Sequence, residues 1–328
     1  MTLMSKSPRI VLRAVLSVVA LATLAACSSG GASDGASYNP AVTGTLAPQQ
    51  IEAPPADLAT AAGIKPAEVT KAIAAARTLT WRTVKAAGVT QAVACTGSGS
   101  PTVVYSNGLL IQAAWTWPLI AQEQAKTNRV CMFDRPGTGL SPDRPTSASP
   151  NGPVANAKEL FGLMTAINEP GPYLIVGWSY GGIVAQTAAA LEPASVAGLN
   201  LIDSVTPAQY RTFDKTGWDE AGQPLDMKSA EQAINSAGDF GAKPLVVLVA
   251  GNDPEAAGFT TSWTKVQKEL AATSTNSAYG VVANVGHTIP QQAPAAVEAA
   301  GLVSTKSATS GQPMEKCPTG FKAAGIVC

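Results

Sequence analysis

The stretch that decides the fold is LIVGWSYGG, residues 174–182, in which three branched apolar residues lead into a serine flanked by glycines. The run Tyr173–Val176 is typical of a buried strand, and the following GGIVAQTAAALEP is typical of a helix. A G-x-S-x-G motif between a strand and a helix forms a tight turn that exposes the serine side chain. We therefore predict that Ser179 is a nucleophile; the alternative is a serine that only completes a turn.

A serine nucleophile needs a base, and the sequence contains a single histidine, His287, in YGVVANVGHTIP. A neutral imidazole can accept the serine proton and return it to the leaving group. Two aspartates end predicted strands between the serine and the histidine, Asp203 in LNLIDS and Asp253 after PLVVLVAGN. Either carboxylate can orient the imidazole, and the other would be a cap or turn residue. We favour Asp253 as the acid and keep Asp203 as the alternative.

Apolar runs alternate with alanine-rich helical segments along most of the chain, which predicts an α/β fold with a mostly parallel central sheet and helices on both faces. A helix is predicted at Pro66–Arg77, with proline in its first turn. The segment at about 205–241 is more polar and is predicted to be a small lid insertion. The predicted strands are Trp81–Val84, Gln91–Cys95, Thr102–Tyr105, Arg129–Phe133, Tyr173–Val176, Ala197–Ile202, Pro244–Ala250 and Ala278–Val285.

The composition excludes some functional classes. Lys and Arg number 22, as do Asp and Glu, and no basic cluster is present, so nothing in the charge pattern indicates nucleic-acid binding. With 46% hydrophobic residues, the chain can bury a sizeable core rather than remain disordered.

The N-terminus has the pattern of a targeting segment. Basic residues, among them Arg9 and Arg13, precede a short apolar run that ends in Leu24-Ala25-Ala26-Cys27. This ending resembles the lipobox of bacterial lipoproteins, which implies that Cys27 is lipidated and becomes the mature N-terminus. The alternative is an ordinary signal peptide. We expect a signal peptide at 1–26, a flexible tether at 27–63 and a folded domain at 64–328, with a C-terminal tail from about 304.

Export to an oxidising compartment favours disulfides among the other four cysteines, which allow three pairings. We favour Cys317 with Cys328, because this pair would close the C-terminal tail. A metal site is disfavoured, since the sequence has neither a CxxC motif nor a pair of histidines.

From about Trp81 to Val303 the chain resembles the α/β-hydrolase superfamily. The resemblance rests on GSGSPTVVYSNG, NRVCMFDRPGTGLS, GPYLIVGWSYGG, PLVVLVAGNDP and NVGHTIP, taken in this order. It implies Ser179 as nucleophile, His287 as base and Asp253 as the usual acid, whereas some members place the acid one strand earlier. The family's sheet also places the strands of Cys95 and Cys131 side by side, and the resemblance therefore implies a disulfide between these two cysteines.

One position departs from the family's pattern. Many members have His-Gly after the strand at 102–105, and this chain has Asn107-Gly108. An oxyanion hole uses backbone N–H groups, so the change need not abolish it, and we expect the N–H groups of Tyr180 and Leu109 to serve. The amide of Asn107 is expected to brace the loop, and DRPGTG, residues 134–139, to be a structural turn behind it.

The sequence thus predicts an exported, lipid-anchored serine hydrolase that cleaves small-to-medium carboxylic esters at the outer face of a bacterial membrane. Its expected partners are the ester substrate and the membrane, and no cofactor or metal is implied. Trp115, Trp117 and Trp178 are candidates for an apolar acyl pocket. Two alternatives remain: an exported aminopeptidase or amidase on the same fold, and a non-catalytic binding or scaffold lipoprotein.

Overall fold

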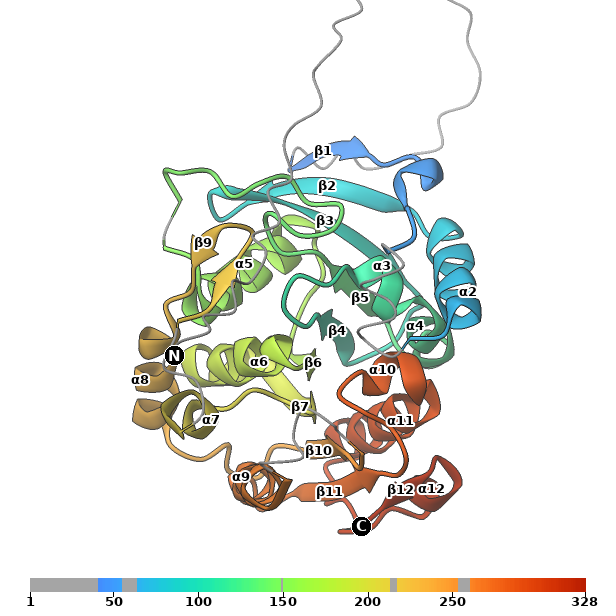
Figure 1. Ribbon diagram of the computed structural model, residues 1–328, viewed down its shortest axis with the longest axis vertical. Coiled ribbons are helices and arrows are strands. Elements are labelled where there is room, and N and C mark those ends of the chain that lie inside the picture. Colours follow the sequence, from blue (N-terminus) through green and yellow to red (C-terminus); the bar gives the residue numbers. More distant parts are fainter. Residues whose placement is uncertain (1–40, 55–63, 149, 213–216, 253–259) are drawn as a thin grey trace, which may run out of the picture. The chain divides into compact units, whose positions relative to one another are not determined.

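The computed structural model describes residues 41–54, 64–148, 150–212, 217–252 and 260–328 (Figure 1). The predicted signal peptide, Cys27 and part of the predicted tether therefore lie outside the described residues. Within the described part, no helix is both long enough and apolar enough to span a membrane.

A ten-stranded sheet runs through the described part of the chain, in the order β1-β2-β3-β5-β4-β6-β7-β10-β11-β12. The six strands from β5 to β11 in this order are parallel, while β1, β2, β3 and β12 pair antiparallel with their neighbours. This confirms the predicted mostly parallel sheet. The strands are β1 Val42–Thr45, β2 Trp81–Ala86, β3 Val89–Thr96, β4 Thr102–Ser106, β5 Val130–Phe133, β6 Tyr173–Trp178, β7 Val196–Ile202, β10 Leu245–Ala250, β11 Ser277–Val282 and β12 Ile326–Val327.

Helices cover both faces of the sheet (Figure 1). One buried core packs α2, α3, α4, α10, α11 and α12 on one face, and a second packs α5, α6 and α9 on the other. Apolar side chains alternate between these two cores along each central strand, so the strands are apolar throughout. The helices are α2 Pro66–Arg77, α3 Ala113–Thr116, α4 Pro118–Gln124, α5 Pro153–Ala166, α6 Tyr180–Leu191, α9 Thr260–Ala272, α10 Ile289–Gln292, α11 Pro294–Ser310 and α12 Thr319–Ala323.

Residues 41–54, which were predicted to belong to the flexible tether, are part of the folded domain. Residues 42–45 form β1, which pairs antiparallel with β2, and Ile51 is buried in the first core. Arg77 fixes this segment by donating a hydrogen bond from Nη2 to the carbonyl oxygen of Ile51, at 2.8 Å. The folded domain therefore begins before residue 64. The sequence did not predict this, because the segment is mostly polar and contains only one short edge strand and one buried apolar anchor, Ile51.

The insertion expected at about 205–241 lies between β7 and β10. It contains α7 Pro207–Thr212, a short hairpin of β8 Asp219–Glu220 and β9 Gln223–Pro224, and α8 Met227–Ala237. Val205, Leu225, Met227 and Ala230 pack against α6 in a third buried core. The insertion is therefore anchored on the helix that follows the serine turn.

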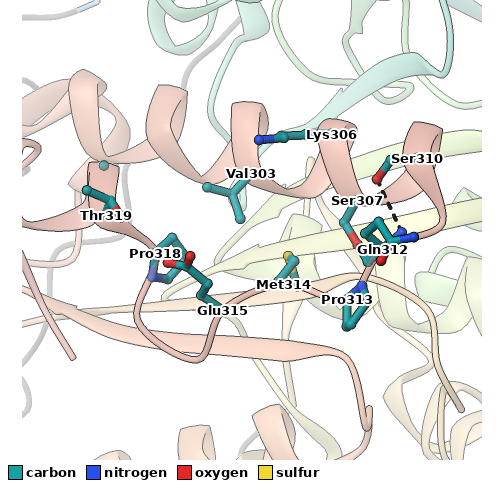
Figure 2. Close-up of a pocket in the computed structure, with 11 residues that line it drawn as sticks. Val303, Lys306, Ser307, Ser310, Gln312, Pro313, Met314, Glu315, Pro318 and Thr319 are labelled. Carbon is teal, nitrogen blue, oxygen red and sulfur yellow. Dashed lines mark hydrogen bonds between the residues drawn. The ribbon is translucent and has the colours of Figure 1, made fainter.

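Both favoured cysteine pairs are joined, Cys95 to Cys131 across β3 and β5, and Cys317 to Cys328 in the C-terminal tail. The tail adds β12 to the edge of the sheet and leaves a hollow of about 490 Å³ against α11 (Figure 2). Lys306, Met314 and Glu315 are among the side chains that line this hollow.

Candidate active site

The predicted turn at Ser179 is present at the junction of β6 and α6. Ser179 has φ 53° and ψ −122°, a conformation that is rare outside glycine and that lifts the side chain out of the sheet. A Cβ added to Gly177 would lie 2.4 Å from the carbonyl oxygen of Gly181, so the crossing of strand and helix requires a glycine there. The G-x-S-x-G sequence thus follows from the close approach of two backbones.

Three side chains from separate strand ends meet at this turn. The Oγ of Ser179 lies 2.8 Å from Nε2 of His287, and Nδ1 of the same ring lies 2.7 Å from Oδ2 of Asp203. Asp203 is fully buried, whereas about a third of the histidine side chain is exposed. The arrangement has the order of contacts of a nucleophile, a base and an orienting acid.

Among the described residues, the carboxylate in contact with the histidine is that of the alternative candidate, Asp203. The favoured candidate, Asp253, lies outside the described residues. Asp203 directly follows β7, and its backbone is held by a hydrogen bond from its N–H to the carbonyl oxygen of Leu248, at 2.7 Å. Its φ of +42° is a second strained backbone position beside Ser179.

The other carboxylate oxygen of Asp203 also has defined partners. Oδ1 accepts hydrogen bonds from the backbone N–H of Ala250, at 3.2 Å, and from the indole N–H of Trp263, at 3.0 Å. With two donors on Oδ1 and the imidazole on Oδ2, the carboxylate is fixed in one orientation. The backbone of His287 is held as well, because the indole N–H of Trp178 donates to its carbonyl oxygen at 2.8 Å.

Asn107 braces the loop after β4, as expected. Its Nδ2 donates to the carbonyl oxygen of Phe133 at 3.1 Å and to Oδ1 of Asp134 at 3.3 Å, and its Oδ1 accepts from the indole of Trp117. Asn107 is almost completely buried, so its side chain supports the loop from within the core. Trp117 is fully buried as well and stacks on Tyr105, which makes it a core residue and not part of an acyl pocket.

The two backbone N–H groups expected to form the oxyanion hole have no hydrogen-bond acceptor among the described residues. Tyr180 is the first residue of α6, and the first N–H groups of a helix have no partner within it. Leu109 lies in the loop directly after Gly108. Both N–H groups are therefore available for an oxyanion.

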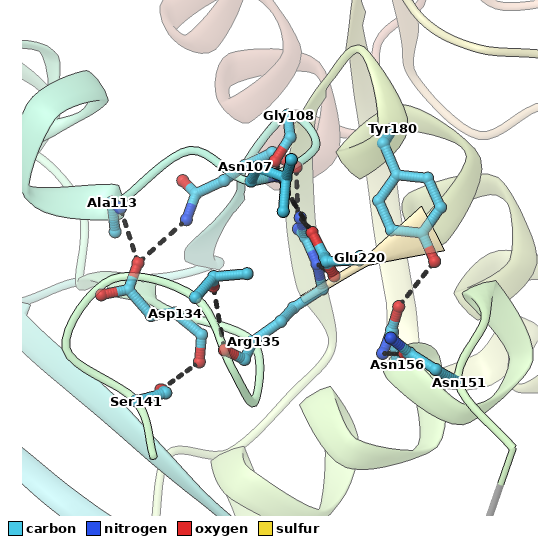
Figure 3. A network of polar contacts seen from close by, with 12 residues as sticks. Asn107, Gly108, Ala113, Asp134, Arg135, Ser141, Asn151, Asn156, Tyr180 and Glu220 are labelled. Carbon is cyan, nitrogen blue, oxygen red and sulfur yellow. Dashed lines mark hydrogen bonds and ion pairs between the residues drawn. The ribbon is translucent and has the colours of Figure 1, made fainter. Parts of the chain in front are cut away.

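The DRPGTG segment, residues 134–139, is the predicted structural turn, and Asp134 anchors it. Its two carboxylate oxygens accept the N–H of Ala113, at 2.7 Å, and the N–H of Leu140, at 2.9 Å. Burial raises the pKa of Asp134 to about 6, although these two hydrogen bonds act in the opposite direction. The carboxylate therefore ties the start of α3 to the far end of the turn. Figure 3 shows its contact with Ala113.

Two charged residues that the sequence did not single out lie beside the loop after β4. Arg135 and Glu220 are both almost completely buried and form an ion pair with an N–O distance of 2.6 Å. Burial by itself would lower the pKa of Arg135, but the charge and hydrogen bonds of Glu220 outweigh it and raise the pKa above its ordinary value. No sequence signal marks the pair, because the two residues are 85 positions apart.

A second polar network holds the side chain of Tyr180 (Figure 3). Its hydroxyl donates to Oδ1 of Asn156 at 2.8 Å, and Nδ2 of Asn156 lies 3.3 Å from Oε2 of Glu159. Glu159 is paired in turn with Arg144, at 2.6 Å. The residue that follows the serine is therefore fixed at its ring as well as at its backbone.

One group of potential metal ligands lies close together among the described residues, Cys95, Cys131 and Glu169. Both sulfur atoms are in the disulfide, and Glu169 is paired with Arg129. These side chains are therefore committed to structural contacts.

The fold and the site agree with a comparison with known families. Residues 96–300 match the model of the alpha/beta hydrolase family, and the chain belongs to this family. The matched range includes Ser179, Asp203 and His287, and membership of this family supports a hydrolase activity.

Individual relatives are distant. The chain is 23% identical to the uncharacterized protein YqjL of Bacillus subtilis over 208 residues, which cover 60% of the chain and 81% of that protein. A candidate lipase from Acinetobacter baumannii has a TM-score of 0.57 at 19% identity and covers 74% of this chain and 96% of its own. An esterase from Thermogutta terrifontis has a TM-score of 0.52 at 20% identity, and the match covers 69% of this chain and 98% of the esterase. At these identities the structures show a shared fold.

Proposed function

We propose that this protein is a serine hydrolase that cleaves carboxylic esters through an acyl-enzyme. The observation that carries the proposal is the continuous contact from Ser179 Oγ to His287 Nε2, at 2.8 Å, and from His287 Nδ1 to Asp203 Oδ2, at 2.7 Å. The three side chains come from the ends of β6 and β7 and the loop after β11. A fully buried carboxylate is costly unless it is paired, and Asp203 is held by two N–H donors on Oδ1 so that Oδ2 faces the imidazole.

The mechanism assigns one step to each group. Ser179 attacks the ester carbonyl while Nε2 of His287 takes its proton, and Asp203 keeps the other imidazole nitrogen protonated and stabilises the cation. The N–H groups of Leu109 and Tyr180 stabilise the oxyanion of the tetrahedral intermediate. Collapse expels the alcohol, which receives the proton from the imidazolium, and a water molecule then hydrolyses the acyl-enzyme by the same sequence.

Asp203 takes the place of Asp253 as the proposed acid. A carboxylate one strand after the nucleophile's strand reaches Nδ1 directly here, because β6 and β7 are neighbours in the sheet. Nδ1 has room for one acceptor in the ring plane. A second carboxylate is therefore not needed for this function.

The substrate class proposed is a small-to-medium ester, because the insertion between β7 and β10 is modest in size. The same triad chemistry cleaves amides, so an aminopeptidase or amidase activity is the outcome that a substrate panel would distinguish. A scaffold without catalysis is the outcome expected if Ser179 does not react.

The location proposed is the outer face of a bacterial membrane, with the domain anchored through a lipid on Cys27. The lipobox-like sequence at 24–27 supports this proposal. Two disulfides in a single domain are also typical of proteins exported to an oxidising compartment.

The test is hydrolysis of nitrophenyl esters of increasing acyl length, beside a panel of aminoacyl nitroanilides, by the purified protein and by Ser179→Ala. The proposal expects ester turnover by the wild type and a loss of at least about 10⁴-fold in kcat for the variant. Turnover of amides in preference to esters would assign the protein to the amidases. Equal rates for both proteins would refute Ser179 as the nucleophile.

A further inference from the structure

The hairpin β8–β9 of the insertion places a carboxylate against the loop that carries the Leu109 N–H. Oε1 of Glu220 accepts the backbone N–H of Leu110 at 3.1 Å and Nη2 of Arg135 at 2.6 Å, and Oε2 accepts Nε of Arg135 at 2.9 Å. Glu220 is fully buried, so both of its oxygens are used inside the protein. The insertion therefore reaches the loop through one side chain.

Arg135 continues the contact from Glu220 to the loop backbone. Its Nη1 donates to the carbonyl oxygen of Asn107 at 2.8 Å, and its Nη2 donates to the carbonyl oxygen of Gly108 at 2.7 Å (Figure 3). Its guanidinium carbon also lies 4.9 Å from the ring centre of Tyr180. One guanidinium thus contacts both segments that supply the proposed oxyanion donors.

These contacts set the direction of the Leu109 N–H. The peptide between Gly108 and Leu109 is planar and trans, so its C=O and its N–H point in opposite directions. Because Arg135 holds the Gly108 carbonyl, the N–H of Leu109 points away from the guanidinium. Leu110 adopts φ +59°, a strained conformation for leucine, and its N–H is held there by Glu220.

A purely structural role does not require this chemistry. Buried ion pairs can often be replaced by apolar residues of similar volume without loss of stability. An apolar pair, however, cannot donate to the two loop carbonyls. What Arg135 and Glu220 contribute beyond packing is therefore the orientation of the loop.

We propose that Glu220 is a positioning residue that acts through Arg135 to hold the oxyanion loop, and so couples the insertion to the chemical step. The proposal rests on the serine hydrolase function proposed above. It goes beyond that function because it gives the insertion a role in the rate of the reaction and not only in covering the substrate.

The test uses the full-length protein, nitrophenyl acetate turnover and the rate of labelling by a fluorophosphonate. The informative variant is Arg135→Met combined with Glu220→Leu, which fills the same space and removes the donors. We expect a folded protein with a lower melting temperature, because the buried carbonyls of Asn107 and Gly108 lose their donors. We also expect a fall of about 10²-fold in kcat and in the labelling rate, and a KM within about threefold of wild type. The single variant Arg135→Lys keeps a charge beside Glu220 but cannot hold both carbonyls, and we expect it to lower kcat in the same way.

The matched control is the ion pair at the opposite end of β5, Arg129 with Glu169, changed to Arg129→Met and Glu169→Leu. It does not contact the loop, and we expect its kcat to be unchanged. A folded Arg135→Met/Glu220→Leu protein, or a folded Arg135→Lys protein, with wild-type kcat would overturn the inference alone. A wild type that neither turns over the ester nor reacts with the probe would overturn the proposed function and this inference with it.

Discussion

The identity of the acid gives the sharpest single prediction, which is that Asp203→Asn inactivates the protein by fixing the wrong tautomer of His287. In the wild type, Oδ1 of Asp203 receives two N–H donors, from Ala250 and Trp263. An asparagine must therefore keep its carbonyl oxygen on that side and turn its NH₂ group toward Nδ1. Because the NH₂ group donates, Nδ1 becomes an acceptor and the imidazole proton moves to Nε2.

A proton on Nε2 prevents the imidazole from accepting the proton of Ser179 Oγ, which lies 2.8 Å away. Such a tautomer change in a Ser-His-Asp triad lowers kcat by about 10⁴-fold, or about 5.5 kcal/mol of transition-state stabilisation. We expect a loss of this size in kcat for nitrophenyl acetate, with KM nearly unchanged. The shape of the side chain is retained, so the free energy of unfolding should change little.

The control for this prediction is Asp253→Asn, which is expected to keep kcat within about threefold of wild type. Circular dichroism and a urea titration of both variants exclude unfolding as the cause. The reasoning is refuted if Asp203→Asn keeps more than about a tenth of wild-type kcat while Asp253→Asn loses the 10⁴-fold expected of the acid. In that case Asp253 would be the acid.

The remaining predictions concern stability. A Cβ at Gly181 would lie 2.2 Å from a backbone carbonyl oxygen at the end of β4, so Gly181→Ala should lower the free energy of unfolding in urea by about 3 kcal/mol, whereas Gly320→Ala, with open space around it, should not. The Cys95–Cys131 disulfide has a sequence separation of 36, so changing both cysteines to alanine should cost about 4 kcal/mol in the same titration, and wild-type stability in the variant would contradict this. Burial raises the pKa of Asp134 from 3.8 to about 6, so the folded protein disfavours the ionised carboxylate. The free energy of unfolding is therefore unaffected by this group below pH 4, where the carboxyl is protonated in both states, and falls as the pH rises through 6. Between pH 4 and pH 7 the wild type should therefore lose about 3 kcal/mol relative to Asp134→Asn, and parallel pH profiles would contradict this.

The sequence was sufficient for the features that depend on local patterns. The central strands are continuous apolar runs because both of their faces are buried, and the helix at Pro66–Arg77 has the predicted bounds. The G-x-S-x-G motif located Ser179 because the backbone crossing admits only glycine at Gly177. His287 needed no choice, since the chain has one histidine.

Features that depend on contacts between distant segments were missed or left open. Asp203 and Asp253 both follow apolar strands, and the sequence does not show that β6 and β7 are neighbours, which is what brings Asp203 to the histidine. Glu220 is one acidic residue in a polar insertion, and its burial arises from an arginine on another loop. The strand β1 has four residues within a polar stretch, so pairing with β2 defines it more than its own sequence does.

The central claim is that Ser179 is an activated nucleophile, and the most direct measurement is its covalent labelling. Purified protein would be treated with a fluorophosphonate, and its intact mass would be measured by mass spectrometry. Digestion and peptide mapping would then locate the adduct. We predict a single adduct on the peptide that contains LIVGWSYGG, at Ser179, and no adduct in Ser179→Ala or in His287→Ala. An unmodified wild type with native circular dichroism, or an adduct on another residue, would contradict the account.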